Sequence, residues 1–456
     1  MKNLFLVLML SAFILAGCNC PVPPAKTESK APVSQVKRVA WSKNANIYEV
    51  NVRQYTQEGT FNAFKAHLPR LKEMGVDILW LMPVNPIGEK NRKGSLGSYY
   101  SVRNYVAINP EFGNMEDFKN LVKEAHSLGM YLIIDWVANH TAWDHAWITD
   151  HPDWYAKDSS GQQPYAPFGW EDVAQLDYSN RDLRNAMTES LAFWVKEADI
   201  DGFRCDVASM VPTDFWDSSR RVLDQIKPVF MLAEAEKDSL LLNAFDMDYG
   251  WSLLSINNKI AKGKANLSAL DGYFAKLDTT LPVGAIKMNF TTNHDENSWN
   301  GTVQDIYKDG RKTFAVLTAT IPGMPMIYSG QEADYNHALL FFEKDPIVWN
   351  DFPMAGFYKT LLSLKHDNAA LWNGLEGGTS RRIPSLADTA VFAFLREKDD
   401  KKVFVVLNLT GQIQQIKLAC DGFAGQYSDV FGGGTMNLPK EFARDLKPWE
   451  YLVYEK

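Results

Sequence analysis

Charged side chains follow several apolar, β-rich segments of this sequence at the point where each segment ends. The stretch "DGFRCDVA" places Arg204 and Asp206 on one face of an expected strand, because they alternate with apolar residues. Burying such an ion pair is costly unless each ion is well partnered. The rest of the chain must therefore supply partners for this face.

Three other segments end in polar residues of the same kind. Glu234 follows "VFMLA", and the remaining candidates are Asp135, Asn139 and His140 after one segment and Asn293, His294 and Asp295 after another. Asp206, Glu234 and Asp295 are more carboxylates than a structural core tolerates. Cleavage of a glycosidic bond needs such a set, because one carboxylate attacks the anomeric carbon while another group protonates the leaving oxygen. We expect Arg204 to lower the pKa of Asp206 and keep it ionised, with Asp135 as a second partner of Arg204.

These residues need a scaffold that brings the ends of the segments together. Eight β-rich segments alternate with helical patterns, at 46–56, 77–84, 131–140, 201–208, 229–236, 244–251, 285–296 and 324–332. The clearest helix is 114–128, with Asn114 as N-cap, Asp117 three residues on and Gly129 at its end. Eight such units predict an α/β fold of the (β/α)8 TIM-barrel type, in which the site lies at the C-terminal ends of the strands.

Two intervals depart from this repeat. Residues 141–177, after the third strand, are too many for a loop and a helix alone, so we expect a small excursion domain there. After residue 374 short alternating strands with Gly-rich turns predict a C-terminal antiparallel β-sandwich, 375–456. The catalytic barrel is then made of residues 41–140 and 178–374.

The N-terminus has the pattern of an export signal. A short basic start and an apolar run end in "LAGC", which resembles the lipobox of bacterial lipoproteins. The resemblance implies a lipoprotein signal peptide, 1–17, and a lipid on the sulfur of Cys18, followed by a tether, 18–40. We therefore expect an exported, membrane-anchored lipoprotein, on the outer membrane and facing the periplasm or the surface. Cys205 and Cys420 stand some two hundred positions apart, which argues against a disulfide framework.

Composition limits the partners. The formal net charge of -8 gives no reason to expect a nucleic-acid partner. Aromatic residues are plentiful, with 14 Trp, 18 Tyr and 25 Phe, which suits a large core and also a sugar-binding surface. The partners we expect are an α-glucan or maltooligosaccharide substrate and, through the anchor, a lipid bilayer.

Five short motifs resemble, in order, the sequence regions of the α-amylase family, glycoside hydrolase family 13. They are "DWVANH", "QLDY", "GFRCDVA", "LAEAE" and "TTNHDE", and the similarity extends over residues 41–456. The resemblance implies that Asp206 is the nucleophile and Glu234 the acid/base. Asp295 would bind sugar hydroxyls and stabilise the transition state.

The same resemblance implies further site residues. Tyr100, His140, Arg204 and His294 would bind substrate, with Asp135 and Asn293 in support. Tyr99 competes with Tyr100 as the stacking tyrosine. Four tryptophans, Trp143, Trp147, Trp154 and Trp170, suit outer sugar subsites and core packing equally well.

No cofactor is needed for this chemistry. Asn139 stands where the family often has a calcium ligand, with Asp172 or Asp177 as partners, so calcium is implied only as a structural ion.

Hydrolysis of α-1,4-glucosidic bonds in starch-type glucans is the activity implied by the resemblance. Ser209 and Met210 replace the Lys-His pair that many α-amylases carry, and this stretch is closer to neopullulanases and cyclomaltodextrinases. A neopullulanase-like hydrolase and an α-glucan transglycosylase therefore stay open. A lipid-anchored glucan-binding protein without activity is a further alternative, although such a protein would be expected to lack a catalytic carboxylate.

Overall fold

The computed structural model describes residues 31–456. The predicted signal peptide, Cys18 and most of the predicted tether lie outside the described residues. Residues 31–44 run along the barrel, where Ser34 Oγ donates to the carbonyl of Leu241 at 2.6 Å and Val33 forms a β-bridge with Val283. The predicted tether, 18–40, includes residues 31–40 of this stretch. No helix of residues 31–456 is both long and apolar enough to cross a membrane.

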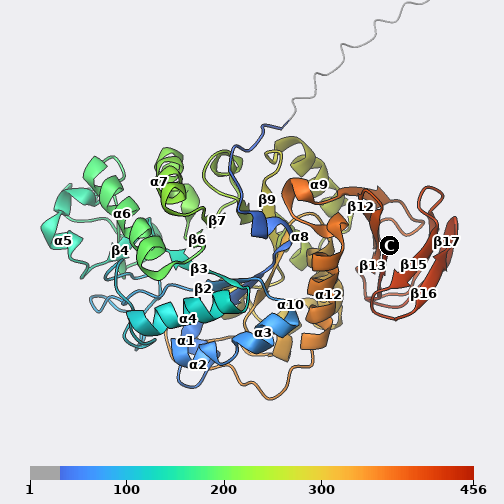
Figure 1. Ribbon diagram of the computed structural model, residues 1–456, viewed down its shortest axis with the longest axis horizontal. Coiled ribbons are helices and arrows are strands. Elements are labelled where there is room, and N and C mark those ends of the chain that lie inside the picture. The colour runs from blue at the N-terminus through green and yellow to red at the C-terminus, as the bar shows by residue number, and fades with distance from the viewer. Residues whose placement is uncertain (1–30) are drawn as a thin grey trace, which may run out of the picture. The chain divides into compact units, whose positions relative to one another are not determined.

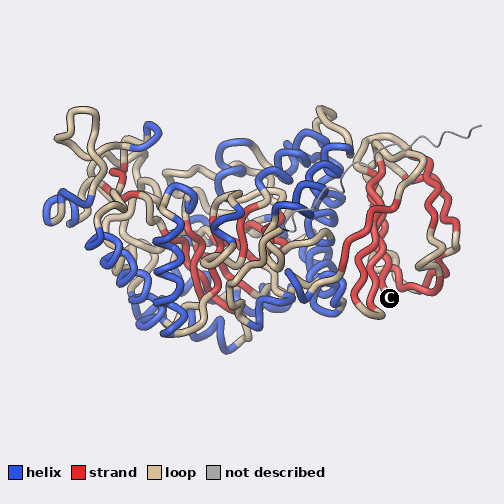
Figure 2. The backbone as a smooth tube through the Cα atoms, turned by 90° about the horizontal axis from the view of Figure 1, so that it is seen from above, coloured by secondary structure: helices blue, strands red, loops and turns tan. Residues whose placement is uncertain are grey.

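Eight parallel strands form a closed barrel, as predicted (Figures 1 and 2). Going round the barrel, each strand pairs with its neighbours and β1 closes the ring by pairing with both β2 and β10. The strands are β1 (Ile47–Val50), β2 (Ile78–Leu81), β3 (Tyr131–Trp136), β6 (Gly202–Cys205), β7 (Phe230–Ala233), β8 (Met247–Tyr249), β9 (Ile286–Asn289) and β10 (Met324–Tyr328). Each lies within one of the eight β-rich segments of the sequence.

Helices surround the strands, as Figure 2 shows in blue around red. They are α1 (Val52–Tyr55), α2 (Phe61–Lys65), α3 (Leu68–Met74), α4 (Met115–Ser127), α6 (Arg181–Ala198), α7 (Thr213–Ile226), α8 (Trp251–Ala261), α9 (Ser268–Thr280), α10 (Val303–Tyr307), α11 (Arg311–Thr320) and α12 (Ala355–Asp367). In α4 the predicted cap is present. The Asn114 side chain accepts hydrogen bonds from the amides of Glu116 and Asp117, and the Asp117 carboxylate accepts one from the Asn114 amide.

Successive side chains along the barrel strands belong to two different packed layers. Phe203 and Cys205 belong to the core between the strands and the helices, whereas Ile133 and Leu232 belong to a second core inside the barrel. Arg204 faces this interior, in register with Asp135 of β3 and Leu232 of β7. The alternation seen in the sequence thus places the Arg204 side chain inside the barrel.

The excursion domain is built on a short antiparallel pair. β4 (His140–Ala142) pairs with β5 (Val173–Gln175), and α5 (Trp147–Asp150) with two 3-10 turns, η2 (Pro152–Trp154) and η3 (Pro167–Gly169), lies between them. The loop that follows β2 is tied to this domain, because Lys93 Nζ forms an ion pair with Asp172 Oδ1 at 3.0 Å.

The C-terminal region is an antiparallel β-domain, as expected. Six strands form one sheet and two form another, namely β11 (Thr379–Ile383), β12 (Val391–Lys398), β13 (Lys401–Asn408), β15 (Gly425–Asp429), β16 (Thr435–Leu438) and β18 (Tyr451–Glu455), with β14 (Gln414–Ala419) and β17 (Glu441–Leu446). Their buried side chains form a separate core that includes Phe404, Leu418 and Phe442. Arg396 joins this domain to the barrel by donating to the carbonyl of Thr320 at 3.0 Å.

Gly202, the first residue of β6, is a sensitive point of the barrel. Its φ is +153°, and a Cβ there would lie 1.8 Å from the carbonyl oxygen of Phe230 in the neighbouring strand. We predict that Gly202→Ala prevents stable folding, as measured by thermal denaturation, because backbone atoms cannot move aside without breaking the pairing of β6 with β7. Gly272→Ala in α9 is the matched control: nothing lies within 4 Å of its Cβ position, so it should leave stability unchanged or raise it by about 1 kcal/mol. A Gly202→Ala variant that melts like the wild type would contradict this account.

Candidate active site

A cavity of about 510 Å³ lies at the C-terminal ends of the barrel strands. Its lining contains Asp206, Glu234 and Asp295, together with Tyr100 and His140. The three carboxylates come from the segments after β6, β7 and β9, so their convergence follows from the parallel barrel. The structure brings together in one cavity the residues that the sequence placed on separate segments.

Arg204 is the centre of the charged network beneath this cavity. Its guanidinium is fully buried; Nη1 lies 2.8 Å from Asp135 Oδ1 and 3.0 Å from Asp206 Oδ1, and Nη2 lies 2.8 Å from Glu234 Oε1. Nε donates to the hydroxyl of Tyr249 at 3.1 Å. Burial alone would lower the pKa of Arg204, but Asp135 and Glu234 raise it well above its usual value. Arg204 therefore stays charged.

The environment of Asp206 differs from our expectation. Burial raises its pKa well above the usual range and the neighbouring Glu234 raises it further, while Arg204 opposes both effects. The expectation of a low pKa counted the ion pair but not the burial of three carboxylates in one place. Arg204 thus limits the rise of the pKa of Asp206 rather than setting it below normal.

Glu234 has an ion pair with Arg204 and one backbone donor, and its apolar neighbours in the sequence indicate neither. The donor is the backbone N–H of Val207, which lies 2.8 Å from Oε2. Val207 has φ 37° and ψ 44°, a left-handed conformation that is strained for a β-branched residue. The strained residue directly after Asp206 therefore aims its amide at the second carboxyl group of the site.

His294 and Asp295 form a second charged group of the site. His294 Nε2 lies 2.8 Å from the Tyr100 hydroxyl and 3.3 Å from Asp295 Oδ2, and Nδ1 is hydrogen-bonded to Glu49. Burial would lower the pKa of His294, but Asp295 and Glu49 raise it well above its usual value. Glu49, fully buried on β1, was missed by the sequence analysis; its signal is a lone acid in the apolar run "NIYEV".

Of the two tyrosines that compete for the stacking role, Tyr100 lies at the cavity and Tyr99 does not. Tyr100 lines the cavity and stacks on His294, with ring centroids 5.5 Å apart, whereas Tyr99 lies outside the lining, under the guanidinium of Arg53. His140 also lines the cavity, and burial lowers its pKa to about 4, so its ring is neutral near pH 7. His294 lies behind Tyr100 and is not part of the lining.

The two residues expected in support lie behind the carboxylates. Asp135 is fully buried and accepts hydrogen bonds from Arg204, from the indole of Trp80 at 3.3 Å and from the Tyr100 hydroxyl at 3.1 Å. Asn293 is also fully buried, and its Oδ1 accepts from the amide of Glu296 at 2.8 Å. That bond fixes the start of the helical turn after Asp295.

The side chains of Asn139, Asp172 and Asp177 have partners within the protein. The side-chain amide of Asn139 is 3.3 Å from His140 Nδ1, Asp172 is ion-paired with Lys93, and Asp177 accepts from the amide of Ser179. Within residues 31–456 no three His, Cys, Asp or Glu side chains are grouped so that they could hold a metal ion. Calcium binding stays a prediction from the resemblance, and no step of the chemistry is assigned to it.

Aromatic side chains complete the cavity. Trp170 of the excursion domain lines it beside His140, with ring centroids 5.6 Å apart, whereas Trp154 is buried in the core. The sequence analysis missed three further lining residues, Trp299, Phe341 and Phe342. They stand outside the recognised motifs, and nothing in their local pattern distinguishes them from core aromatics.

Comparison with known proteins agrees with this geometry. Residues 36–369 match the family described as "Alpha amylase, catalytic domain", and residues 385–448 match "Alpha amylase, C-terminal all-beta domain". The solved structure of a noncanonic maltogenic α-amylase from Thermotoga neapolitana is similar over 90% of this chain and 98% of its own, with 29% identity and a TM-score of 0.83. An α-amylase from Lactobacillus plantarum gives 30% identity, 91% and 99% coverage and a TM-score of 0.82.

Curated relatives include more than one named activity. "Alpha-amylase MalA" of Haloarcula japonica is 27% identical over 88% of this chain, which spans only 61% of that relative's length. "Neopullulanase 2" of Thermoactinomyces vulgaris is 27% identical over 85% of this chain and 69% of its own. The family match covers most of the chain and coincides with the barrel and the β-domain. The protein therefore belongs to the α-amylase family and is a glycoside hydrolase.

Proposed function

We propose that this protein is a retaining α-glycosidase that hydrolyses α-1,4-glucosidic bonds in starch-type glucans and maltooligosaccharides. The observation that supports it best is the sharing of one guanidinium: Arg204 binds Asp206 through Nη1 and Glu234 through Nη2. This arrangement keeps the two carboxyl groups close together. Retaining enzymes need a separation of about 5–5.5 Å, whereas inverting enzymes leave room for a water between the carboxyl groups.

In the first step Asp206 attacks the anomeric carbon while Glu234 gives its proton to the glycosidic oxygen. The bond from the anomeric carbon to that oxygen breaks, the leaving sugar departs with the proton, and the remaining glycosyl group is esterified to Asp206. In the second step Glu234 takes a proton from water, and the water oxygen attacks the anomeric carbon. The ester bond breaks, Asp206 is released as a carboxylate, and the product keeps the α configuration.

The carboxylates around the sugar ring stabilise the positive charge that develops on it between these states. Asp295 is suited to this role because its pKa stays below the usual value: burial raises it, but His294, Arg204 and Trp299 together lower it more. A charge fixed in advance stabilises the transition state without reorganisation of the site. Tyr100, bonded to His294 and Asp135, offers a ring face to the same sugar.

The acceptor of the glycosyl group decides between hydrolysis and transfer. A transglycosylase forms the same ester on Asp206 and differs only in that a sugar hydroxyl replaces water. Relatives named as α-amylases, a neopullulanase and maltosyltransferases all support the shared first step. We favour hydrolysis with short products and some turnover of pullulan or cyclodextrin, because Ser209 and Met210 provide no charged pair after Asp206.

We also propose that the protein is exported and anchored to the outer membrane through a lipid on Cys18. The support is the sequence alone, namely the apolar run that ends in "LAGC". The folded enzyme starts well after that residue, so the anchor and the catalytic machinery are separable.

The first test concerns the catalytic carboxylates. Asp206→Asn and Glu234→Gln should each lower kcat on maltotetraose by a factor of about 10²–10⁴ and leave thermal unfolding near that of the wild type. Asp214→Asn, an exposed carboxylate ion-paired with Arg184, is the control and should keep full turnover. Proton NMR of the wild-type reaction should show the α anomer first. Full turnover in either active-site variant, or a β product, would show that the roles are assigned wrongly.

A second test concerns the substrate. We expect the wild type to cleave maltooligosaccharides and soluble starch, and the double change of Ser209 to Lys and Met210 to His to shift product lengths without abolishing activity. Chromatography of products from amylose, pullulan and cyclodextrin measures the substrate range of the wild type and the product lengths of the double variant. Activity on sucrose, trehalose or a purely α-1,6 glucan, with none on any α-1,4 glucan, would exclude this substrate class. Tight glucan binding without turnover would identify a binding protein instead.

The anchor has its own test. Cys18→Ser should release a soluble enzyme of normal activity, because the lipid is attached to the sulfur of that residue. Membrane fractionation of cells that express the full chain measures the distribution, and the wild type is the reference. A variant that stays as firmly membrane-bound as the wild type would rule out anchoring through Cys18.

A further inference from the structure

Three aromatic residues form one wall of the cavity, which we call the aromatic wall: Trp299, Phe341 and Phe342. Trp299 lies on the π-helical turn η6 (Glu296–Asn300), and the two phenylalanines lie on the loop between β10 and α12. The Trp299 ring centroid is 5.4 Å from that of Phe341 and 5.9 Å from that of Phe342. Phe341 in turn stacks against Tyr100 at 6.3 Å and 17°, so the wall continues into the catalytic centre.

Trp299 is unusually exposed to solvent for a residue that packs against two other aromatic side chains. Its side chain is 58% exposed, although both phenylalanines pack against it. A large exposed aromatic side chain on a cavity wall is costly to hydrate and is typical of binding surfaces. An indole presents a flat apolar face and one polar edge, which matches the C–H face and the hydroxyl rim of a pyranose ring.

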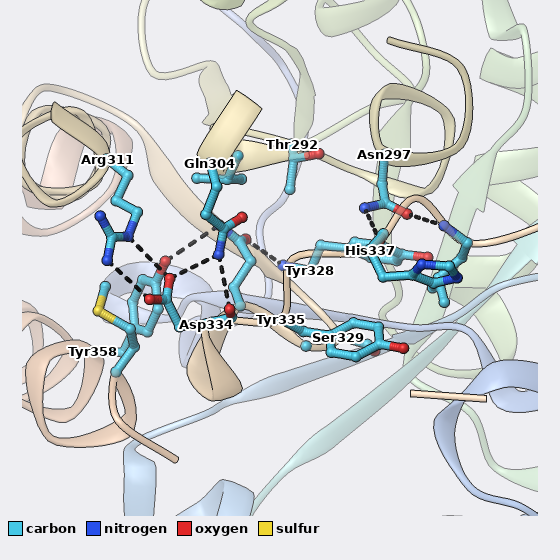
Figure 3. Close-up of a pocket in the computed structure, with 15 residues that line it drawn as sticks. Thr292, Asn297, Gln304, Arg311, Tyr328, Ser329, Asp334, Tyr335, His337 and Tyr358 are labelled. Atoms are coloured by element: carbon cyan, nitrogen blue, oxygen red, sulfur yellow. Dashed lines mark hydrogen bonds and ion pairs between the residues drawn. The ribbon is translucent and has the colours of Figure 1, made fainter. Parts of the chain in front are cut away.

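The two segments that carry the wall are fastened to each other, as Figure 3 shows. Asn297 donates from Nδ2 to the carbonyl of His337 at 3.1 Å and accepts from the amide of Leu339 at 2.9 Å. Further along the loop, Asp334 is bound by Arg311 at 2.9 Å and by the Gln304 side chain at 2.8 Å. Because these bonds fix the loop against η6, α10 and α11, the wall is prepared before a ligand arrives.

The position of the wall relative to the carboxylates indicates which part of a glucan it meets. Trp299 lies on η6, the turn whose N-cap residue is Asp295, and the wall reaches Tyr100 through Phe341. Glu234, which protonates the leaving oxygen, lies instead beside Val207. The wall therefore adjoins the side of the cavity that holds the sugar attached to Asp206 and not the side of the leaving sugar.

We infer that Trp299, backed by Phe341 and Phe342, stacks on a glucose unit on the non-reducing side of the cleaved bond and thereby favours substrates that carry a second sugar there. This inference rests on the proposed α-glucan activity and adds a residue that determines substrate length. Trp299 binds substrate and takes no part in the proton transfers or in the attack on the anomeric carbon.

The test measures binding first, in the Glu234→Gln background, where turnover is slowed. Isothermal titration with maltotetraose should give a Kd about tenfold weaker for Trp299→Ala, and a Kd within about threefold of the parent for Trp299→Phe, because the phenyl ring keeps the stacking face. Leu386→Ala, at a side chain that is 78% exposed in the C-terminal domain, is the control and should bind like the parent. Since Trp299 is largely exposed, thermal unfolding of all variants should agree within a few degrees.

Cleavage positions give the second readout, in the active enzyme. With reducing-end-labelled maltopentaose, Trp299→Ala should move cleavage toward the non-reducing end, because a stacking position on that side is lost, and KM should change more than kcat. Unchanged affinity, or a shift toward the reducing end, would overturn the inference while the enzyme still hydrolyses the substrate. If the proposed activity itself is wrong, the wild type leaves maltopentaose intact, and the inference falls with it.

Discussion

Arg204 is fully buried, and its guanidinium bonds three carboxylates that come from three different strand ends, Asp135, Asp206 and Glu234. Any one of these charges alone inside the barrel would carry a desolvation cost of several kcal/mol. Together they are tolerable because one planar cation reaches all three, Asp135 and Asp206 through Nη1 and Glu234 through Nη2. The spacing of β3, β6 and β7 around the barrel, with Arg204 in register with Asp135, is what makes this sharing possible.

The rest of the site is arranged around that network. Val207 has a strained backbone conformation in which its amide donates to Glu234. Glu49 is hydrogen-bonded to His294 and holds it against Tyr100 and Asp295. These contacts leave each carboxylate in a different setting: Asp206 has a raised pKa and Asp295 a lowered one. The lowered pKa of Asp295 suits the fixed charge proposed for it, whereas the ionised form of Asp206 that the proposed attack needs depends on the ion pair with Arg204.

Much of this could be predicted from the sequence, for identifiable reasons. The barrel follows from eight short β-rich runs that alternate with helical patterns, and the meeting of Asp206, Glu234 and Asp295 follows from their places at the ends of parallel strands. The contact of Arg204 with Glu234 could not be predicted, because it depends on how far a side chain extends across the barrel. Glu49 was overlooked because a single acidic residue in a strand has no second polar residue at a fixed spacing to mark it as part of a site. Trp299 and Phe341 meet only through the folding of a loop whose conformation is set by long-range bonds from Asn297 and Asp334.

The excess of acids over bases in the network has a consequence for the choice of ligand. Five carboxyl groups, those of Glu49, Asp135, Asp206, Glu234 and Asp295, face two cationic groups, those of Arg204 and His294. The cavity floor therefore favours a guest that brings its own positive charge. A ring amine in place of the sugar's oxygen, protonated in solution, would resemble the charge of the transition state and bind more tightly than the neutral sugar of the same shape. A uronic acid in that position would be repelled by Asp295, whose pKa is lowered, so the same electrostatics disfavour acidic polysaccharides.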